Sequence, residues 1–144
     1  MSYYLGVDVG TGSARVGLFN TEGCLIAHHT EPIQTWKPSA NHVEQSSEDI
    51  WDAICRCSKA VCAQSPHTSN RIAGIGFDAT CSLVLVDSDG SPVTVDPDGD
   101  ASKNIIVWMD HRALEETVVL NVLSDEFSVF NYVGGKISPE MQLP

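Results

Sequence analysis

The chain is short of basic residues and has no long hydrophobic run. Its 144 residues include 8 Lys and Arg against 19 Asp and Glu, a formal net charge of −11 at pH 7. A nucleic-acid surface needs clustered positive charge, so nucleic acid is not an expected partner. No apolar run approaches the roughly 18 residues of a membrane span, and no basic-then-apolar N-terminal signal is present. Neither a membrane partner nor secretion is therefore indicated.

Several common site patterns are also missing. The five cysteines (24, 55, 57, 62 and 81) are odd in number and accompany no secretory signal, which favours free thiols in the cytoplasm. They do not form the C-x-x-C pairs with histidines that a zinc site needs. The chain also lacks the Walker A loop, the dinucleotide G-x-G-x-x-G and the G-x-S-x-G elbow of hydrolases.

What is present fits one mixed α/β domain. Apolar runs at residues 3–9, 15–20 and 24–30 predict a three-stranded antiparallel meander, with Gly23 at a positive φ in its second turn. Residues 31–45 read as a loop. The further expected elements, in chain order, are a helix capped by Ser46 or Ser47 and ending near Gln64, a strand at 71–78, a hairpin around 87–90, a short strand at 104–108, and a helix at 110–123 with an acidic cap.

The segment at residues 4–19 carries the clearest chemical pattern. An apolar strand reaches Asp8, which we expect to be buried, and a tight turn of Gly10, Thr11, Gly12 and Ser13 follows. Glycines let a ligand approach the backbone closely and tolerate positive φ. Turn amides and hydroxyls can cradle phosphate, and an aspartate beside them can hold Mg²⁺. The pattern indicates a nucleotide-phosphate site, with an ordinary glycine hairpin as the alternative.

Two later segments suit a sugar. Asp78 and Thr80, at a predicted strand end, could bond sugar hydroxyls, or they could only form a hydroxyl turn. Trp108 could pack its indole on a polyol, or it could be a core residue with Asp110 capping a helix. We expect Arg112 to pair with a nearby acid, such as Asp8 or Asp78.

Taken together, these segments resemble the FGGY family of carbohydrate kinases. The matching stretches are Gly6-Val-Asp8-Val-Gly10-Thr11-Gly12-Ser13-Ala-Arg15, Val43-Glu44-Gln45-Ser-Ser-Glu48-Asp49-Ile-Trp51, Gly74-Ile-Gly-Phe-Asp78 and Trp108-Met-Asp110-His-Arg112, and Gly134-Gly135 and Ser138-Pro-Glu-Met141 also fit. The resemblance implies an actin-like ATPase or ribonuclease H-like α/β fold, with a mixed sheet and helices. It also implies that residues 1–144 are an incomplete N-terminal domain and that the C-terminal domain is absent. The ending at residues 142–144, without a closing strand or helix, fits that expectation.

The resemblance also implies roles for individual residues. Asp8 would lie near Mg²⁺ and the transferred phosphate of ATP. Gly10, Thr11, Gly12 and Ser13 would line the phosphates, with Arg15 close by. The sugar would be lined by Asp78, Ala79, Thr80, Trp108 and Glu140. The family's catalytic base, an aspartate in a later motif, has no counterpart in this chain.

Within the family, residues 77–84 and 108–113 look most like the pentulose kinases of the D-ribulose type. The implied activity is ATP-dependent phosphorylation of a terminal hydroxyl of D-ribulose, by a cytoplasmic protein that is a homodimer at full length. Two alternatives stay open: a kinase for L-ribulose, xylulose or glycerol, and an actin-like module that binds nucleotide or a partner without transfer chemistry.

Overall fold

The computed structural model describes residues 2–141, so residues 142–144, where the chain ends, lie outside the description. The chain divides into two compact units. The first contains residues up to Thr35 together with Ser46–Thr80, and the second contains Trp36–Gln45 together with the residues from Cys81 onward.

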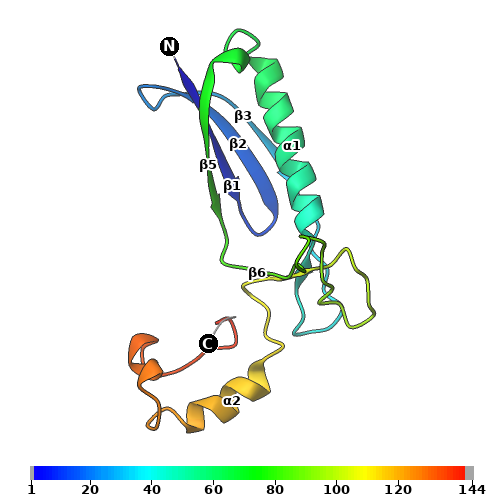
Figure 1. The fold of residues 1–144 in the computed structure, drawn as a ribbon, viewed down its shortest axis with the longest axis vertical. Helices are drawn as coiled ribbons and strands as arrows, with labels where there is room; N and C mark the ends of the chain where they lie inside the picture. The colour runs from blue at the N-terminus through cyan, green and yellow to red at the C-terminus, as the bar shows by residue number, and fades with distance from the viewer. Residues whose placement is uncertain (1, 142–144) are drawn as a thin grey trace. The chain divides into compact units, whose positions relative to one another are not determined.

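The first unit is a four-stranded mixed sheet with one long helix (Figure 1). Its strands are β1 (Tyr3–Val9), β2 (Ser13–Asn20), β3 (Leu25–Pro32) and β5 (Ile72–Ala79), in the spatial order β3-β2-β1-β5. The first three strands form the predicted antiparallel meander, and β5 pairs in parallel with β1. Gly23 has the predicted positive φ, +79°.

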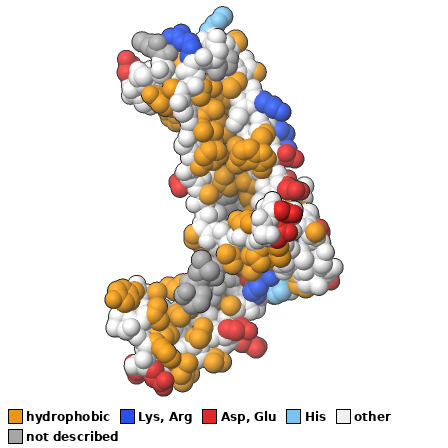
Figure 2. All heavy atoms as spheres, in the orientation of Figure 1, with side chains coloured by type: hydrophobic (Ala, Val, Ile, Leu, Met, Phe, Trp, Pro, Cys, Tyr) orange, Lys and Arg blue, Asp and Glu red, His pale blue; other side chains and the backbone are white. Residues whose placement is uncertain are grey.

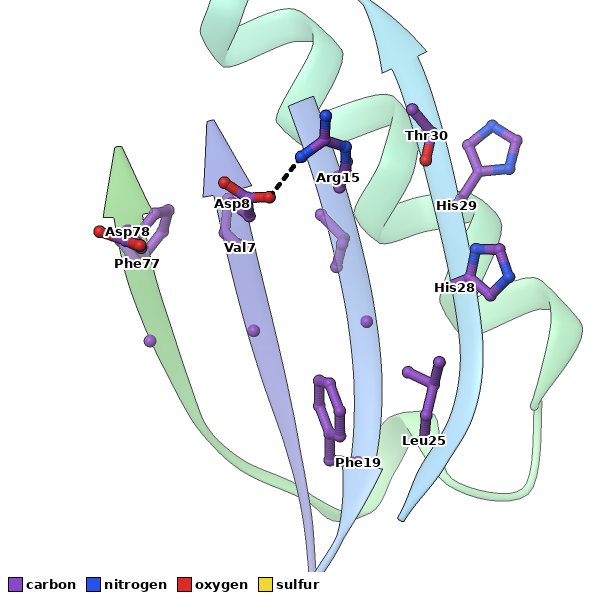
Figure 3. Close-up of a pocket in the computed structure, with 14 residues that line it drawn as sticks. Val7, Asp8, Arg15, Phe19, Leu25, His28, His29, Thr30, Phe77 and Asp78 are labelled. Carbon is purple, nitrogen blue, oxygen red and sulfur yellow. Dashed lines mark hydrogen bonds and ion pairs between the residues drawn. The ribbon is translucent and has the colours of Figure 1, made fainter. Parts of the chain in front are cut away.

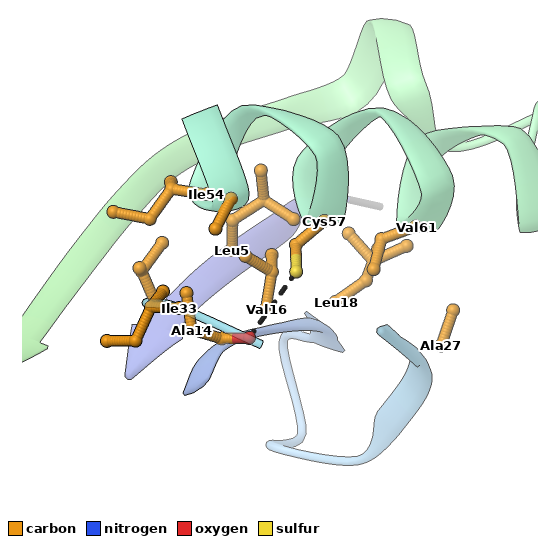
Figure 4. Close-up of a cluster of buried hydrophobic side chains, with 11 residues drawn as sticks. Leu5, Ala14, Val16, Leu18, Ala27, Ile33, Ile54, Cys57 and Val61 are labelled. Carbon is orange, nitrogen blue, oxygen red and sulfur yellow. Dashed lines mark hydrogen bonds between the residues drawn. The ribbon is translucent and has the colours of Figure 1, made fainter. Parts of the chain in front are cut away.

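The helix α1 (Ser47–Gln64) packs on β2 and β3. Side chains alternate between the two faces of a strand, so every second residue of these strands faces the helix. The core side chains, drawn in Figure 4, are Leu5, Val7, Ala14, Val16, Leu18, Ala27 and Ile33 from the sheet side and Ala53, Ile54, Cys57 and Val61 from α1. Burying one large aliphatic side chain of this kind stabilises the fold by about 1.5–3 kcal/mol. Of the two predicted cap candidates, Ser46 and Ser47, Ser46 is the N-cap, and its hydroxyl accepts the Asp49 N–H at 3.3 Å.

The sheet face opposite α1 has a row of glycines at its centre. Gly6 of β1 is in register with Gly17 of β2 and Gly76 of β5. A Cβ at Gly17 would lie 2.8 Å from the Phe19 ring, so glycine is needed there for close packing. The glycine row leaves this face hollow, with the polar strand ends beyond it.

The second unit is built from short elements. Its small antiparallel sheet has the order β4-β7-β6, formed by β4 (Glu44–Gln45), β7 (Ile105–Ile106) and β6 (Leu83–Val84). The helix α2 (Leu114–Val122) follows, and 3-10 turns occur at Ser128–Tyr132 here and at Ser69–Arg71 in the first unit. The hairpin around residue 90 is present: Val86 bridges Pro92, and Gly90 has φ +87°.

Three boundary predictions in this unit were wrong. The supposed loop at residues 31–45 contains β4, and the strand at 104–108 shortens to β7. The second helix begins at Leu114, and Asp110 does not cap it, because the N-cap position is Ala113 without a side-chain bond. The Asp110 carboxylate is instead engaged by Val43 and Arg112.

The surface of α2 is strongly apolar. Val118, Val119 and Val122 are 63%, 65% and 79% exposed, and hydrophobic side chains gather on the visible face of this unit (Figure 2). Beyond the acidic first turn with Glu115 and Glu116, α2 therefore presents a group of exposed apolar side chains, and such patches typically mark contacts with other protein. Among the described residues, no helix combines the length and apolarity needed to span a membrane.

Candidate functional site

The turn between β1 and β2 is held by its own backbone. The Gly10 N–H donates to the Ser13 carbonyl at 3.0 Å, and the Ile33 N–H donates to the Gly12 carbonyl at 3.2 Å. Neither Gly10 nor Gly12 has a positive φ. A Cβ at Gly12 would meet no atom within 4 Å, and one at Gly10 would be in ordinary contact with the Arg15 guanidinium. The protein's own packing therefore does not require these glycines, and the space over them remains available to a ligand.

Asp8 is exposed, so the expectation that it is buried was wrong. It alternates with the buried Val7 along β1 and points to the face opposite α1. Its Oδ2 lies 2.6 Å from Arg15 Nη1, and both side chains are about half exposed. Register places Asp8 opposite Arg15 on β2 and opposite Asp78 on β5. The three side chains consequently form one row across the strand ends (Figure 3).

This row borders a groove of about 530 Å³ in the first unit. Phe19 and Leu25 line its apolar part, and Asp8, Arg15 and Asp78 line its charged part. No group of three His, Cys, Asp or Glu side chains that could hold a metal occurs among the described residues. The chain therefore fits Mg²⁺ only in the way the ion usually binds beside nucleotides, through one or two carboxylates with phosphate and water oxygens completing the octahedron.

The candidate sugar residues of the first unit continue from β5. Asp78 shares the face of Asp8, and its Oδ1 accepts the Ala79 N–H at 3.0 Å. The Thr80 N–H donates to the Val9 carbonyl at 3.1 Å, which extends the β1–β5 pairing by one residue. Asp78, Ala79 and Thr80 thus lie at the same end of the sheet as the glycine turn.

The other two candidates, Trp108 and Glu140, belong to the second unit. Trp108 follows β7 and is 37% exposed, so it is not the core residue of the alternative interpretation. The main-chain N–H of Trp108 donates to Ser82 Oγ at 3.1 Å. Glu140 accepts from His111 at 2.7 Å, and hydrogen bonds from Ser138, then the His111 contact, lower the pKa of its carboxyl.

Arg112 pairs with nearby acids, as the sequence led us to expect, but these are Asp110 and Glu44 of the second unit and not Asp8 or Asp78. The three side chains form a largely buried ion cluster within that unit. The Arg112 guanidinium donates to Asp110 through Nε and Nη2, to Glu44 Oε1 and to the Val95 carbonyl, at 2.9–3.0 Å. Burial by itself would raise the pKa of Asp110, but hydrogen bonds from Arg112 and the Val43 N–H outweigh it and hold that pKa below the usual value.

Glu44 has a feature that sequence reasoning did not single out. It is fully buried, Arg112 engages Oε1, and Oε2 has no hydrogen-bond partner. A buried carboxylate oxygen without a partner is costly, so this atom is a candidate acceptor for a hydroxyl group or a water. The signal in the sequence was an acid placed directly after Val43 in a short extended stretch.

Comparison with known proteins identifies the chain as a member of the FGGY family of carbohydrate kinases. The model of that family's N-terminal domain matches residues 3–142. The chain is 49% identical over 142 residues to an FGGY carbohydrate kinase domain-containing protein of Homo sapiens, covering 99% of this chain and 25% of that protein. It is 43% identical over 144 residues to D-ribulokinase YDR109C of Saccharomyces cerevisiae, covering 99% and 20%. The chain thus spans between a fifth and a quarter of the length of these relatives.

Solved structures agree on the fold. A "xyloylose kinase" from Brucella ovis superposes with a TM-score of 0.79 at 20% identity, covering 96% of this chain and 27% of that one. A ligand-bound xylulose kinase from Lactobacillus acidophilus gives 0.74 at 19% identity, covering 91% and 24%. The predicted actin-like α/β fold is confirmed.

The buried and the exposed arginine should differ in their contribution to stability. Arg112→Met leaves Glu44 and Asp110 buried without a counter-charge, so we expect it to lower the free energy of unfolding by about 3–5 kcal/mol. Arg15→Met, the matched control, removes only the exposed pair with Asp8 and should cost less than about 1 kcal/mol. Urea denaturation of both variants measures the difference, and equal losses would contradict this view of the buried cluster.

Proposed function

We propose that this chain is the sugar-side and phosphate-side portion of an ATP-dependent pentulose kinase that acts on D-ribulose. The observation that carries the proposal is the row of Asp8, Arg15 and Asp78 beside the open glycine turn. The similarity to a protein named D-ribulokinase supports the choice of sugar. The product is the sugar phosphorylated at a terminal hydroxyl.

The phosphate side works by positioning and charge. In phosphoryl transfer, charge spreads over the oxygens of the moving group, and catalysis depends on holding nucleophile and phosphate together. Amides of the turn from Gly10 to Ser13, with the Thr11 and Ser13 hydroxyls, would bind the phosphates of ATP. Asp8 would hold Mg²⁺, which when bound neutralises phosphate charge, and Arg15 would orient the Asp8 carboxylate through their 2.6 Å contact.

The sugar side offers acceptors and one aromatic face. Asp78 and Thr80 would bond hydroxyls of the pentulose, with Ala79 leaving room between them. Trp108 would cover the carbon chain, since an indole provides an apolar face. Glu140 would accept a further hydroxyl through its carboxylate oxygens, which are charged at neutral pH as in any glutamate. The catalytic base would lie in the remainder of the complete protein.

Several sugars compete with D-ribulose as the substrate. Relatives at lower identity include proteins named glycerol kinase (31%) and ribulokinase (30%). The competing candidates are xylulose, which differs from D-ribulose by one inverted hydroxyl, L-ribulose, which is its mirror image, and the shorter polyol glycerol. We further propose a cytoplasmic homodimer for the complete protein; the five free thiols and the exposed apolar surface of α2 support this.

Asp8→Asn in the complete protein should lower kcat by about two to three orders of magnitude while changing sugar KM little. The lost charge matters where the phosphoryl group moves, so its effect concentrates in the transition state. Steady-state kinetics with ATP and D-ribulose measure it, and Asp52→Asn on the exposed surface of α1 is the control. A kcat equal to that of the control would remove Asp8 from the site.

Trp108→Ala in the complete protein should raise sugar KM and leave kcat nearly unchanged. Packing against a polyol is uniform binding, and losing it costs about 1–3 kcal/mol. Trp51, which is 57% exposed on α1, provides the matched control Trp51→Ala. If both variants keep the parent KM, Trp108 does not contact the sugar.

The chain of residues 1–144 on its own should not phosphorylate D-ribulose. General-base and positioning contributions multiply, and the sequence contains no counterpart of the family's base motif. Incubation with ATP, Mg²⁺ and D-ribulose, followed by an ADP assay, tests this, with the complete protein as the positive control. Clear turnover by the chain alone would show that the base lies within it.

A further inference from the structure

We infer that Ser82 is a positioning residue for Trp108, acting on the sugar subsite through the main chain of that tryptophan. This inference rests on the proposed sugar role of Trp108. The contact that carries it is the hydrogen bond from the Trp108 N–H to Ser82 Oγ, at 3.1 Å. Both residues lie in the second unit, so the contact is internal to it.

The contact closes one end of a strand ladder. Leu83 of β6 is in register with Ile106 of β7, and the two strands are antiparallel. Ser82 precedes Leu83 by one residue, and Trp108 follows Ile106 by two, so both lie beyond the same end of this two-residue ladder. The Ser82 side chain thereby supplies a further cross-strand bond where the backbone pairing stops.

The backbone on the other side of Trp108 is anchored separately. The Val107 N–H donates to the Val43 carbonyl at 3.0 Å, and the Asp110 N–H turns back to the Val107 carbonyl at 2.8 Å. Asp110 Oδ2 accepts the Val43 N–H at 2.6 Å. These bonds fix residues 107 and 110 against the β4 side, whereas the Ser82 hydroxyl fixes the amide of Trp108 itself.

Fixing that amide restricts the indole. Rotation about the Trp108 backbone dihedrals swings the Cα–Cβ bond, and with it the whole ring, which is partly exposed. Sugar binding against a mobile ring carries an entropic cost for ordering that ring, and a ring that is already held in place reduces this cost. The hydroxyl therefore acts on sugar affinity and not on the chemical step. Alanine removes the acceptor, and threonine retains it.

The experiment uses the complete protein and two independent readouts. The first is sugar KM and kcat for Ser82→Ala, Ser82→Thr, Trp108→Ala and the double variant Ser82→Ala/Trp108→Ala. We expect Ser82→Ala to raise KM roughly fivefold, the effect of one neutral hydrogen bond, with kcat unchanged within about twofold. Ser82→Thr should restore KM, and the double variant should match Trp108→Ala, since Ser82 acts through that ring.

The second readout needs no activity. In fluorotryptophan-labelled protein, the ¹⁹F resonance of Trp108, assigned by its loss in Trp108→Ala, should shift or broaden in Ser82→Ala and recover in Ser82→Thr. The resonances of Trp36 and Trp51 should stay unchanged and serve as internal controls.

The outcomes separate the inference from the proposed function. An unmoved Trp108 resonance overturns the inference, whatever the kinetics. If the resonance moves but only Trp108→Ala, and not Ser82→Ala, raises the sugar KM, the inference is also overturned. The same holds if the effects of the two substitutions on KM are additive in the double variant. If neither Trp108→Ala nor Ser82→Ala changes sugar KM although the resonance moves, the sugar role of Trp108 is wrong and the functional part of the inference falls with it.

Discussion

The register of β1 between β2 and β5 is the constraint on which the site depends. Side chains alternate along a strand, so fixing Val7 against α1 fixes Asp8 on the opposite face. Antiparallel pairing then sets Arg15 beside Asp8, and parallel pairing sets Asp78 on its other side. A slip of one residue would bury the carboxylate and expose the core. The apolar packing under α1 therefore also positions the charged row.

The two arginines differ in burial, and burial decides whether their charged groups can interact with a ligand. Arg112 is surrounded by Asp110, Glu44 and the Val95 carbonyl, so its donors are occupied within the fold. Arg15 and Asp8 are half exposed and contact each other beside a groove. Screening by solvent makes such a pair contribute little to stability. A weak exposed pair is able to rearrange around a charged ligand, whereas the buried cluster is not.

The sequence predicted the meander, the cap at Ser46 and the positive φ of Gly23 because each depends on local pattern and turn chemistry. It misjudged Asp8, since a strand with glycine and valine on both sides does not reveal which face is covered. It also misassigned Arg112, because the partner Glu44 lies 68 positions away and only tertiary structure brings the two together. Of the two properties of glycine that the sequence offered for the turn, space over the backbone is the one present at Gly12, and neither Gly10 nor Gly12 uses a positive φ.

The candidate sugar residues were found as separate short patterns, and the backbone supports them to different degrees. The backbone pairing of β1 with β5 positions Asp78 and Thr80. Trp108 lies in a turn closed by the bond from the Asp110 N–H to the Val107 carbonyl, and side chains at Ser82 and Asp110 anchor that turn to neighbouring segments. Side-chain anchoring of that kind leaves no periodic signal, which explains why the sequence indicated the tryptophan but not the groups that hold it.

A crystal structure of the complete protein with Mg²⁺, a non-hydrolysable ATP analogue and D-ribulose would show directly whether the β1–β2 turn binds phosphate. We predict that the terminal phosphates lie against the amides of the Gly10–Ser13 turn, with Mg²⁺ bound to the Asp8 carboxylate directly or through one water. Phosphates bound elsewhere, with the β1–β2 turn and Asp8 facing only solvent, would contradict a phosphate and Mg²⁺ site at this turn.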